Sequence, residues 1–194
     1  MSLLRAFVAC ELSGSLQEAI QNATADLRAS LGPDLVRWVP RRNIHLTLKF
    51  LGEVSSSSLD LILSALRAEA ARHEAFDMLV AGTGAFPNAR RPRVLWVGLE
   101  APPTLRWLQR DLDSATARLG YKSEEREFSP HLTIGYVRSG TLAAGTEKIR
   151  GALVQTQVGS LGSQYVDAVH LFKSDLQSTG AVHTKMLTAP LGKA

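Results

Sequence analysis

The tripeptide His-Leu-Thr occurs twice in this chain, each time inside a short apolar run. The first copy begins at His45 and the second at His131, a little under half the chain length apart. Residues two apart on a strand point to the same face, so each copy projects its imidazole together with the hydroxyl of Thr47 or Thr133. Two such pairs facing one cleft would form a metal-free acid–base site with two hydroxyl donors. The fold must therefore bring two distant strands together.

The length and composition are those of one globular domain. The chain has 194 residues, of which 45% are hydrophobic and 21% are charged, and these values are ordinary for a soluble protein. No apolar run approaches the roughly 20 residues of a membrane span, and the N-terminus lacks the pattern of a signal peptide. The single cysteine, Cys10, has no intrachain disulfide partner, which is typical of a reducing compartment. We therefore expect a cytoplasmic protein without a membrane segment.

Hydrophobic periodicity and turn residues predict that strands and helices alternate. Strands are expected at 4–12, 35–39, 44–51, 76–85, 93–99, 165–173 and 182–188, with a further strand around the second motif. Helices are expected from residue 15 to a stop at 32–33, and over 59–70, 102–119 and 147–153. A turn around residues 177–180 is expected to join the last two strands.

Residues 4–86 and 93–190 present the same order of predicted elements: strand, helix, link, His-Leu-Thr strand, link, helix and strand. We interpret this order as an internal duplication with weak sequence identity. Chance is the alternative, since strand–helix alternation is common. The expected fold is α+β, a single domain of residues 1–194 built as a bilobal pseudo-twofold duplication. Two mainly antiparallel sheets would line a central cleft, with helices on the outer faces.

Three kinds of chemistry use histidine in such a setting. A metal site needs three or four ligands, and the chain has neither His-Glu-x-x-His nor Cys-x-x-Cys. A serine or cysteine nucleophile needs a context that neither Cys10 nor the serines have. Phosphoryl transfer by acid–base catalysis needs one neutral and one charged imidazole, and the paired motifs favour it. For His73, His170 and His183, a noncatalytic core or surface role is expected.

The charge pattern gives a weaker indication. The net charge is +4, which either an ordinary solvated surface or attraction to a polyanion such as RNA would explain. Arginines cluster before the first motif (Arg37, Arg41, Arg42) and at residues 90–93, and Arg138 follows the second motif. This clustering slightly favours the polyanion.

The motifs and their flanks resemble the RNA 2′,3′-cyclic phosphodiesterases, also called 2′-5′ RNA ligase-like proteins, of the two-histidine phosphoesterase superfamily. Two His-x-Thr/Ser-x motifs in one chain mark that superfamily. The resemblance covers nearly the whole chain and rests on blocks at residues 5–9, 38–53, 86–98, 128–133 and 169–180. It implies hydrolysis of a terminal 2′,3′-cyclic phosphate on RNA to a 2′-phosphomonoester, without a metal or another cofactor.

The resemblance also implies roles for the motif residues. His45 would be the proton donor and His131 the proton acceptor, while Thr47 and Thr133 would bind the substrate phosphate. Many relatives carry an arginine two or three residues after the second threonine, where this chain has Tyr136.

Three weaker candidates for RNA contact are Arg42, Arg138 and Tyr136. An RNA end-binding protein with little or no turnover is the alternative function. Ligation of 2′-5′ ends is the same chemistry in reverse and stays open as a side activity. The sequence does not select the RNA, for which tRNA fragments are one candidate. A pseudo-dimer in one chain needs no obligate protein partner, so a monomer is expected.

Overall fold

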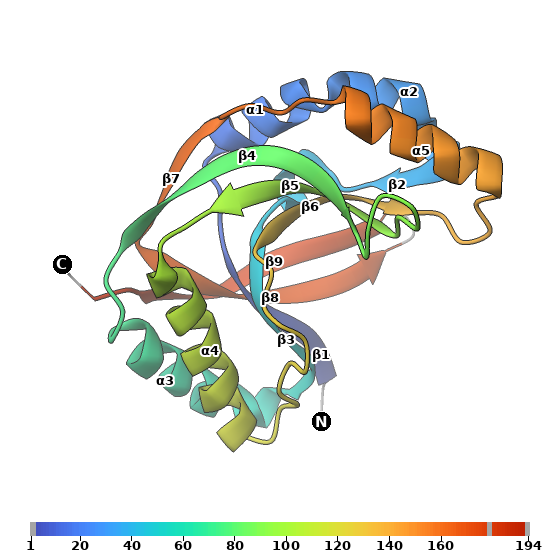
Figure 1. The fold of residues 1–194 in the computed structure, drawn as a ribbon. Helices are drawn as coiled ribbons and strands as arrows, with labels where there is room; N and C mark the ends of the chain where they lie inside the picture. Colours follow the sequence, from blue (N-terminus) through green and yellow to red (C-terminus); the bar gives the residue numbers. More distant parts are fainter. Residues whose placement is uncertain (1–2, 178–179, 193–194) are drawn as a thin grey trace.

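The computed structural model describes residues 3–177 and 180–192. Figure 1 shows strands and helices alternating along the chain. The strands are β1 (Leu3–Cys10), β2 (Val36–Trp38), β3 (Leu46–Ser55), β4 (Phe76–Phe86), β5 (Val94–Glu100), β6 (His131–Val137), β7 (Gly162–Val166), β8 (Ala168–Gln177) and β9 (Gly180–Pro190). The helices are α1 (Gly14–Ala23), α2 (Ala25–Leu35), α3 (Leu59–Ala70), α4 (Pro103–Arg118) and α5 (Ala143–Gln155), with 3₁₀ turns η1 (Arg41–Asn43) and η2 (Ser56–Ser58).

The strands form one curled antiparallel sheet in the order β7-β4-β5-β6-β3-β1-β8-β9, and β2 also pairs with β6. The sheet has two halves, β9-β8-β1-β3 and β7-β4-β5-β6, which meet at one residue pair, Leu46 of β3 and Leu132 of β6. The two predicted sheets are therefore joined through the motif strands. The predicted α+β class with antiparallel pairing is confirmed, whereas the duplication of residues 4–86 and 93–190 stays a prediction.

The helices form two groups on the outside of the sheet (Figure 1). In one group α2 contacts α5 and α1 contacts β7, and in the other α3 packs against α4 and β9. Leucines at helical spacing, such as Leu105, Leu108 and Leu112 of α4, are fully buried. Together with one face of the strands they form a continuous hydrophobic core. A second, small cluster of buried hydrophobic residues consists of Phe7, Ala9 and Phe172.

Several elements differ from the sequence prediction. The first helix begins at Gly14, capped by Ser13, and is interrupted at Thr24. The Thr24 hydroxyl donates to the Ile20 carbonyl over 2.8 Å, and such a bond competes with regular helix geometry. The strand predicted at 165–173 is divided at Asp167 into β7 and β8. The chain changes its pairing partner there, since β7 pairs with β4 and β8 pairs with β1. The helix predicted at 147–153 is longer, residues 143–155.

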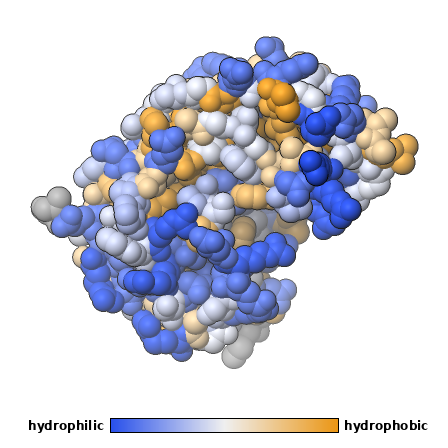
Figure 2. Space-filling model, viewed as in Figure 1, coloured by the Kyte–Doolittle hydropathy of each residue, from blue (hydrophilic) through white to orange (hydrophobic). Residues whose placement is uncertain are grey.

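The surface is mainly polar on the face seen in Figure 2, where apolar groups gather in the upper part. Across residues 3–177 and 180–192, no helix is both long enough and apolar enough to cross a membrane. The turn predicted at 177–180 includes residues 178–179, which lie outside the described residues.

Candidate active site

The contact between β3 and β6 lies at the centre of both motifs. The two motif leucines, Leu46 and Leu132, are Cα partners in antiparallel register. Their side chains are buried in the core, each only 1% exposed or less. Because alternate residues of a strand point to opposite faces, the residues on either side of each leucine point away from the core.

The four polar motif side chains therefore form a compact group. In an antiparallel pair, the residue before one partner lies across from the residue after the other. His45 thus lies across from Thr133, and Thr47 lies across from His131. Side chains opposed in this way have Cβ atoms about 5 Å apart. This register puts each histidine opposite the threonine of the other motif, a crossing that the sequence did not predict.

A β-bulge follows each threonine. Leu48 in β3 and Ile134 in β6 have no partner on the neighbouring strand, where the register shifts by one residue. Such a shift reverses the alternation of side chains, so the third residue after each threonine returns to the site face. These residues are Phe50 and Tyr136, which are 66% and 38% exposed. Plain alternation would have pointed both rings into the core.

His45 lies in an aromatic cluster on the site face. It precedes β3 by one residue, whereas the sequence predicted it within the strand. Its ring stacks on Phe7 with centroids 4.8 Å apart, and Phe172 stacks on Phe7 in turn, at 5.3 Å. The ring of His183 meets His45 at a centroid distance of 5.4 Å. The pKa of His45 is lowered to about 4, mainly by burial and also by His183, while a backbone hydrogen bond with Asn43 acts in the opposite direction.

His131 begins β6 and is oriented by the backbone. Its Nδ1 lies 2.7 Å from the carbonyl oxygen of Ser129, and since a carbonyl only accepts, Nδ1 must carry the hydrogen. The neutral ring therefore keeps its lone pair on Nε2. Phe86 packs against His131 edge to face at 4.8 Å. Burial lowers the pKa of His131, and the Ser129 hydrogen bond partly offsets this effect.

The three weaker candidates have different surroundings. Arg42 is exposed in η1, three residues before His45. Arg138 lies just past β6, and its Nε donates to the Pro33 carbonyl over 2.6 Å. Tyr136 is on the site face, with the guanidinium of Arg37 over its ring at 4.7 Å. The sequence prediction gave His183 a noncatalytic role and named Arg37 only as a member of an arginine cluster, because no local pattern links either residue to the motifs.

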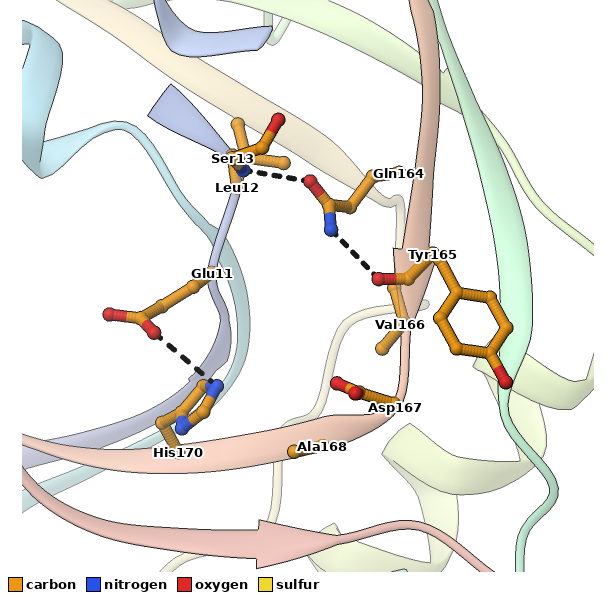
Figure 3. Close-up of a pocket in the computed structure, with 9 residues that line it drawn as sticks. All are labelled: Glu11, Leu12, Ser13, Gln164, Tyr165, Val166, Asp167, Ala168 and His170. Carbon is orange, nitrogen blue, oxygen red and sulfur yellow. Dashed lines mark hydrogen bonds and ion pairs between the residues drawn. The ribbon is translucent and has the colours of Figure 1, made fainter. Parts of the chain in front are cut away.

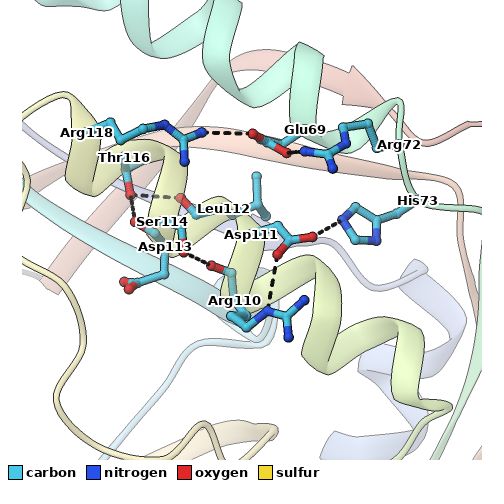
Figure 4. Close-up of polar contacts among 10 residues, drawn as sticks. All are labelled: Glu69, Arg72, His73, Arg110, Asp111, Leu112, Asp113, Ser114, Thr116 and Arg118. Atoms are coloured by element: carbon cyan, nitrogen blue, oxygen red, sulfur yellow. Dashed lines mark hydrogen bonds and ion pairs between the residues drawn. The ribbon is translucent and has the colours of Figure 1, made fainter.

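Two histidines lie outside the motif group. His170 lines a cavity of about 300 Å³ with Glu11 and Asp167 (Figure 3), and its Nε2 lies 3.5 Å from the Glu11 carboxylate. His73 is buried, and its Nε2 lies 3.2 Å from Asp111 (Figure 4), which agrees with the predicted core role. Within the described part of the chain, no three His, Cys, Asp or Glu side chains are grouped so that they could hold a metal ion.

Known proteins are similar to this chain in sequence. The profile of the 2′-5′ RNA ligase superfamily matches residues 16–177. The chain is 34% identical over 183 residues to an RNA 2′,3′-cyclic phosphodiesterase of Methanothermobacter thermautotrophicus, a match that covers 94% of this chain and 96% of the relative. It is 27% identical over 186 residues to a protein of the same name from Aquifex aeolicus, covering 95% of each chain.

Solved structures extend the similarity to the fold. A Thermus thermophilus protein superimposes with a TM-score of 0.79 at 26% identity, over 98% of this chain and 99% of the other. Escherichia coli LigT in complex with 3′-AMP gives a TM-score of 0.78 at 25% identity, over 98% and 99% of the two chains. Because the profile, the relatives and the fold agree over most of its length, this chain belongs to the 2′-5′ RNA ligase superfamily.

Proposed function

We propose that this protein is an RNA 2′,3′-cyclic phosphodiesterase, which hydrolyses a terminal 2′,3′-cyclic phosphate to a 2′-phosphomonoester. One observation carries the proposal: Leu46 and Leu132, the leucines of the two motifs, are antiparallel partners. This pairing supports a site in which two imidazoles and two hydroxyls share one face of the sheet. The names of the relatives from Methanothermobacter and Aquifex support the same activity. RNA ends such as tRNA fragments, in the cytoplasm, are the substrates we infer.

The chemistry needs a base and an acid on opposite sides of phosphorus. Nε2 of His131 takes a proton from water while the water oxygen attacks phosphorus. The bond from phosphorus to the 3′ oxygen breaks, and His45 gives that oxygen its proton. Hydroxyls of Thr47 and Thr133 donate hydrogen bonds to the non-bridging oxygens, where negative charge increases. A 2′-phosphomonoester remains.

The donor role requires His45 to carry a proton when substrate is bound. Its pKa of about 4 means that the protein alone holds this ring neutral at pH 7. An anionic phosphate nearby favours the charged imidazolium, so substrate binding is expected to raise the pKa of His45. The assignment of donor and acceptor follows the family resemblance, because the crossed arrangement of the four side chains treats the two histidines alike.

Replacing either histidine tests the proposal. His45→Ala and His131→Ala should each lower turnover by roughly 10²–10⁴-fold, the usual contribution of a positioned acid or base. Turnover is measured on an oligonucleotide that ends in a 2′,3′-cyclic phosphate, with the product analysed as a 2′- or 3′-monoester. His73→Asn is the matched control, because His73 lies outside the site, and it should keep wild-type activity per folded molecule.

Two outcomes would count against this proposal. Full activity of either alanine variant with an intact circular dichroism spectrum would remove the two-histidine mechanism. Activity should also persist in EDTA, and loss of activity on chelation with recovery in zinc would indicate a metal site instead.

A binding protein for RNA ends is the second candidate, favoured by the low pKa of the His45 ring in the protein alone. Tight binding of the cyclic-phosphate oligonucleotide without any change of its end would support this candidate. Joining of 2′-5′ ends is measured in the same reaction by adding an acceptor with a free 5′-hydroxyl.

A further inference from the structure

The bulge in β6 places Tyr136 beside the reacting groups. On β5, residues 94, 96 and 98 alternate along one strand and so share a face. Their partners on β6 are Tyr136, Thr133 and His131, in that order. Tyr136 therefore lies on the same face of the sheet as His131 and Thr133. Without the bulge, its separation of three residues from Thr133 would put it on the opposite face.

A cation reaches this face from the neighbouring strand. In β2, Arg37 is the direct partner of Tyr136, so the two side chains share a face. The Arg37 guanidinium lies 4.7 Å from the centroid of the Tyr136 ring, and Arg37 is exposed. Within residues 3–177 and 180–192, no ion pair or side-chain hydrogen bond involves Arg37, whose N–H groups are thus available to a ligand.

Two other arginines near the second motif, Arg138 and Arg28, are engaged elsewhere. Arg138 donates to the Pro33 carbonyl. Arg28 lies over the ring of Trp38 at 4.8 Å, and Trp38, next to Arg37 in β2, points to the other face of the sheet. Arg37 is therefore the arginine of this group that the strand register directs to the site face.

The spacing along β6 indicates what Arg37 reaches. Strands rise about 3.3 Å per residue, and Tyr136 and Thr133 face residues of β5 that are two apart, so Tyr136 lies roughly 7 Å along the strand from Thr133. That separation exceeds the size of one phosphate group, so a phosphate held by Thr133 leaves Arg37 facing the adjacent nucleotide. A guanidinium stacked on an aromatic ring keeps its N–H edge free for two phosphate oxygens.

We propose that Arg37, held on the ring of Tyr136, binds the phosphodiester of the nucleotide preceding the cyclic-phosphate end. The pair makes the site selective for the ends of RNA chains over free nucleoside 2′,3′-cyclic phosphates. This inference rests on the proposed function and names the substrate class of the same site.

The test compares two substrates, an oligonucleotide that ends in a 2′,3′-cyclic phosphate and a nucleoside 2′,3′-cyclic phosphate. Arg37→Gln should lower the ratio of kcat/KM between them about tenfold, the usual order for a hydrogen-bonded charge, chiefly through KM for the oligonucleotide. Arg67→Gln is the matched control, because Arg67 is exposed on α3 and its replacement removes the same charge. It should leave the ratio unchanged.

Changes to the ring test the pairing itself. Tyr136→Phe keeps the aromatic face and should keep the ratio, whereas Tyr136→Ala should lower it as Arg37→Gln does. Arg37→Lys keeps the charge without the planar fork and should give an intermediate ratio.

A binding measurement makes the result independent of turnover. The probe is a labelled oligonucleotide that ends in a 2′-phosphate, titrated at several salt concentrations. Loss of one contact to a single-strand phosphate reduces the slope of log K against log salt by about 0.7, so Arg37→Gln should show this reduction and Arg67→Gln should not.

An unchanged ratio and an unchanged salt slope in Arg37→Gln would overturn the proposal. Equal losses on both substrates would also overturn it, by placing Arg37 at the cyclic phosphate itself. If wild-type protein hydrolysed neither substrate, the proposed function would fail, and the salt slope would still decide whether Arg37 binds the RNA backbone.

Discussion

At the scale of single residues, His45 is placed where a charged imidazole is unfavourable. Phe7 stacks on its ring, and His183 meets it edge-on at 5.4 Å. Both neighbours favour the neutral form, the first by excluding water and the second because two adjacent positive rings repel. For His131, burial is what lowers the pKa, and the hydrogen bond to the Ser129 carbonyl supports the charged form of the ring. Substrate binding must therefore do more to charge His45 than His131.

The same burial makes the protein sensitive to acid. In the unfolded chain His45 takes up a proton as pH falls through about 6.5, whereas the folded protein keeps it neutral until about pH 4. Stability is thus lost as pH falls between these values. His45→Phe keeps the aromatic stack and removes the titration, so wild type should lose about 2 kcal/mol more than this variant between pH 7 and pH 5.

Urea unfolding of both proteins at the two pH values measures this difference. The other histidines are common to the two proteins, so their titration cancels in the comparison. The same pH dependence in wild type and His45→Phe would show that the pKa of His45 is not lowered in the folded protein.

At the scale of elements, the sequence predicted what depends on local pattern. Leucine spacing correctly predicted α3 and α4. Alternation in the two motifs predicts that each histidine shares a face with the threonine two residues later. It did not predict the bulges at Leu48 and Ile134, because a bulge is defined by the partner strand. The division of a strand at Asp167 likewise depends on which strands flank it, which is long-range information.

A buried ion pair ties the first motif strand to the segment before the second motif. Lys49 of β3 has a side chain only 3% exposed, and its Nζ donates to the Asp113 carboxylate of α4 and to the Lys122 carbonyl. The Asp113 carboxylate also accepts from the Glu124 backbone N–H. Since residues 122–130 lead directly to β6, this pair holds the approach to His131.

Removing one member of this pair should be strongly destabilising. Asp113→Ala leaves the Lys49 ammonium buried without its counter-charge, and the expected cost is about 3–5 kcal/mol in urea unfolding. The double variant Lys49→Met with Asp113→Leu removes both charges and should be more stable than Asp113→Ala alone. Additive losses in the double variant would mean that Lys49 is not buried with Asp113 as its partner.

At the scale of the whole molecule, each half of the sheet combines both halves of the chain. From either edge the order reads alike: β9-β8-β1-β3 on one side and β7-β4-β5-β6 on the other. β4, from residues 4–86, pairs with β5 and β7, while β8, from residues 93–190, pairs with β1. β4 and β8 thus each pair with the first strand of the other predicted half, an exchange that the matching element order alone does not predict.

From this exchange we expect residues 1–194 to fold as one unit. A chain cut in the exposed connection near residue 90 would leave β4 without β5 and β7, and would leave β1 without β8. Unpaired strand edges and an exposed core face disfavour folding of either piece.

Fragments 1–90 and 91–194 should each be unfolded alone by circular dichroism. When the two fragments are unfolded, mixed and refolded together, they should regain both the native spectrum and cyclic-phosphate hydrolysis. Each motif strand then recovers its partner across the Leu46–Leu132 pair. A cooperative thermal transition in either isolated fragment would contradict the single-domain prediction and indicate two lobes that fold independently.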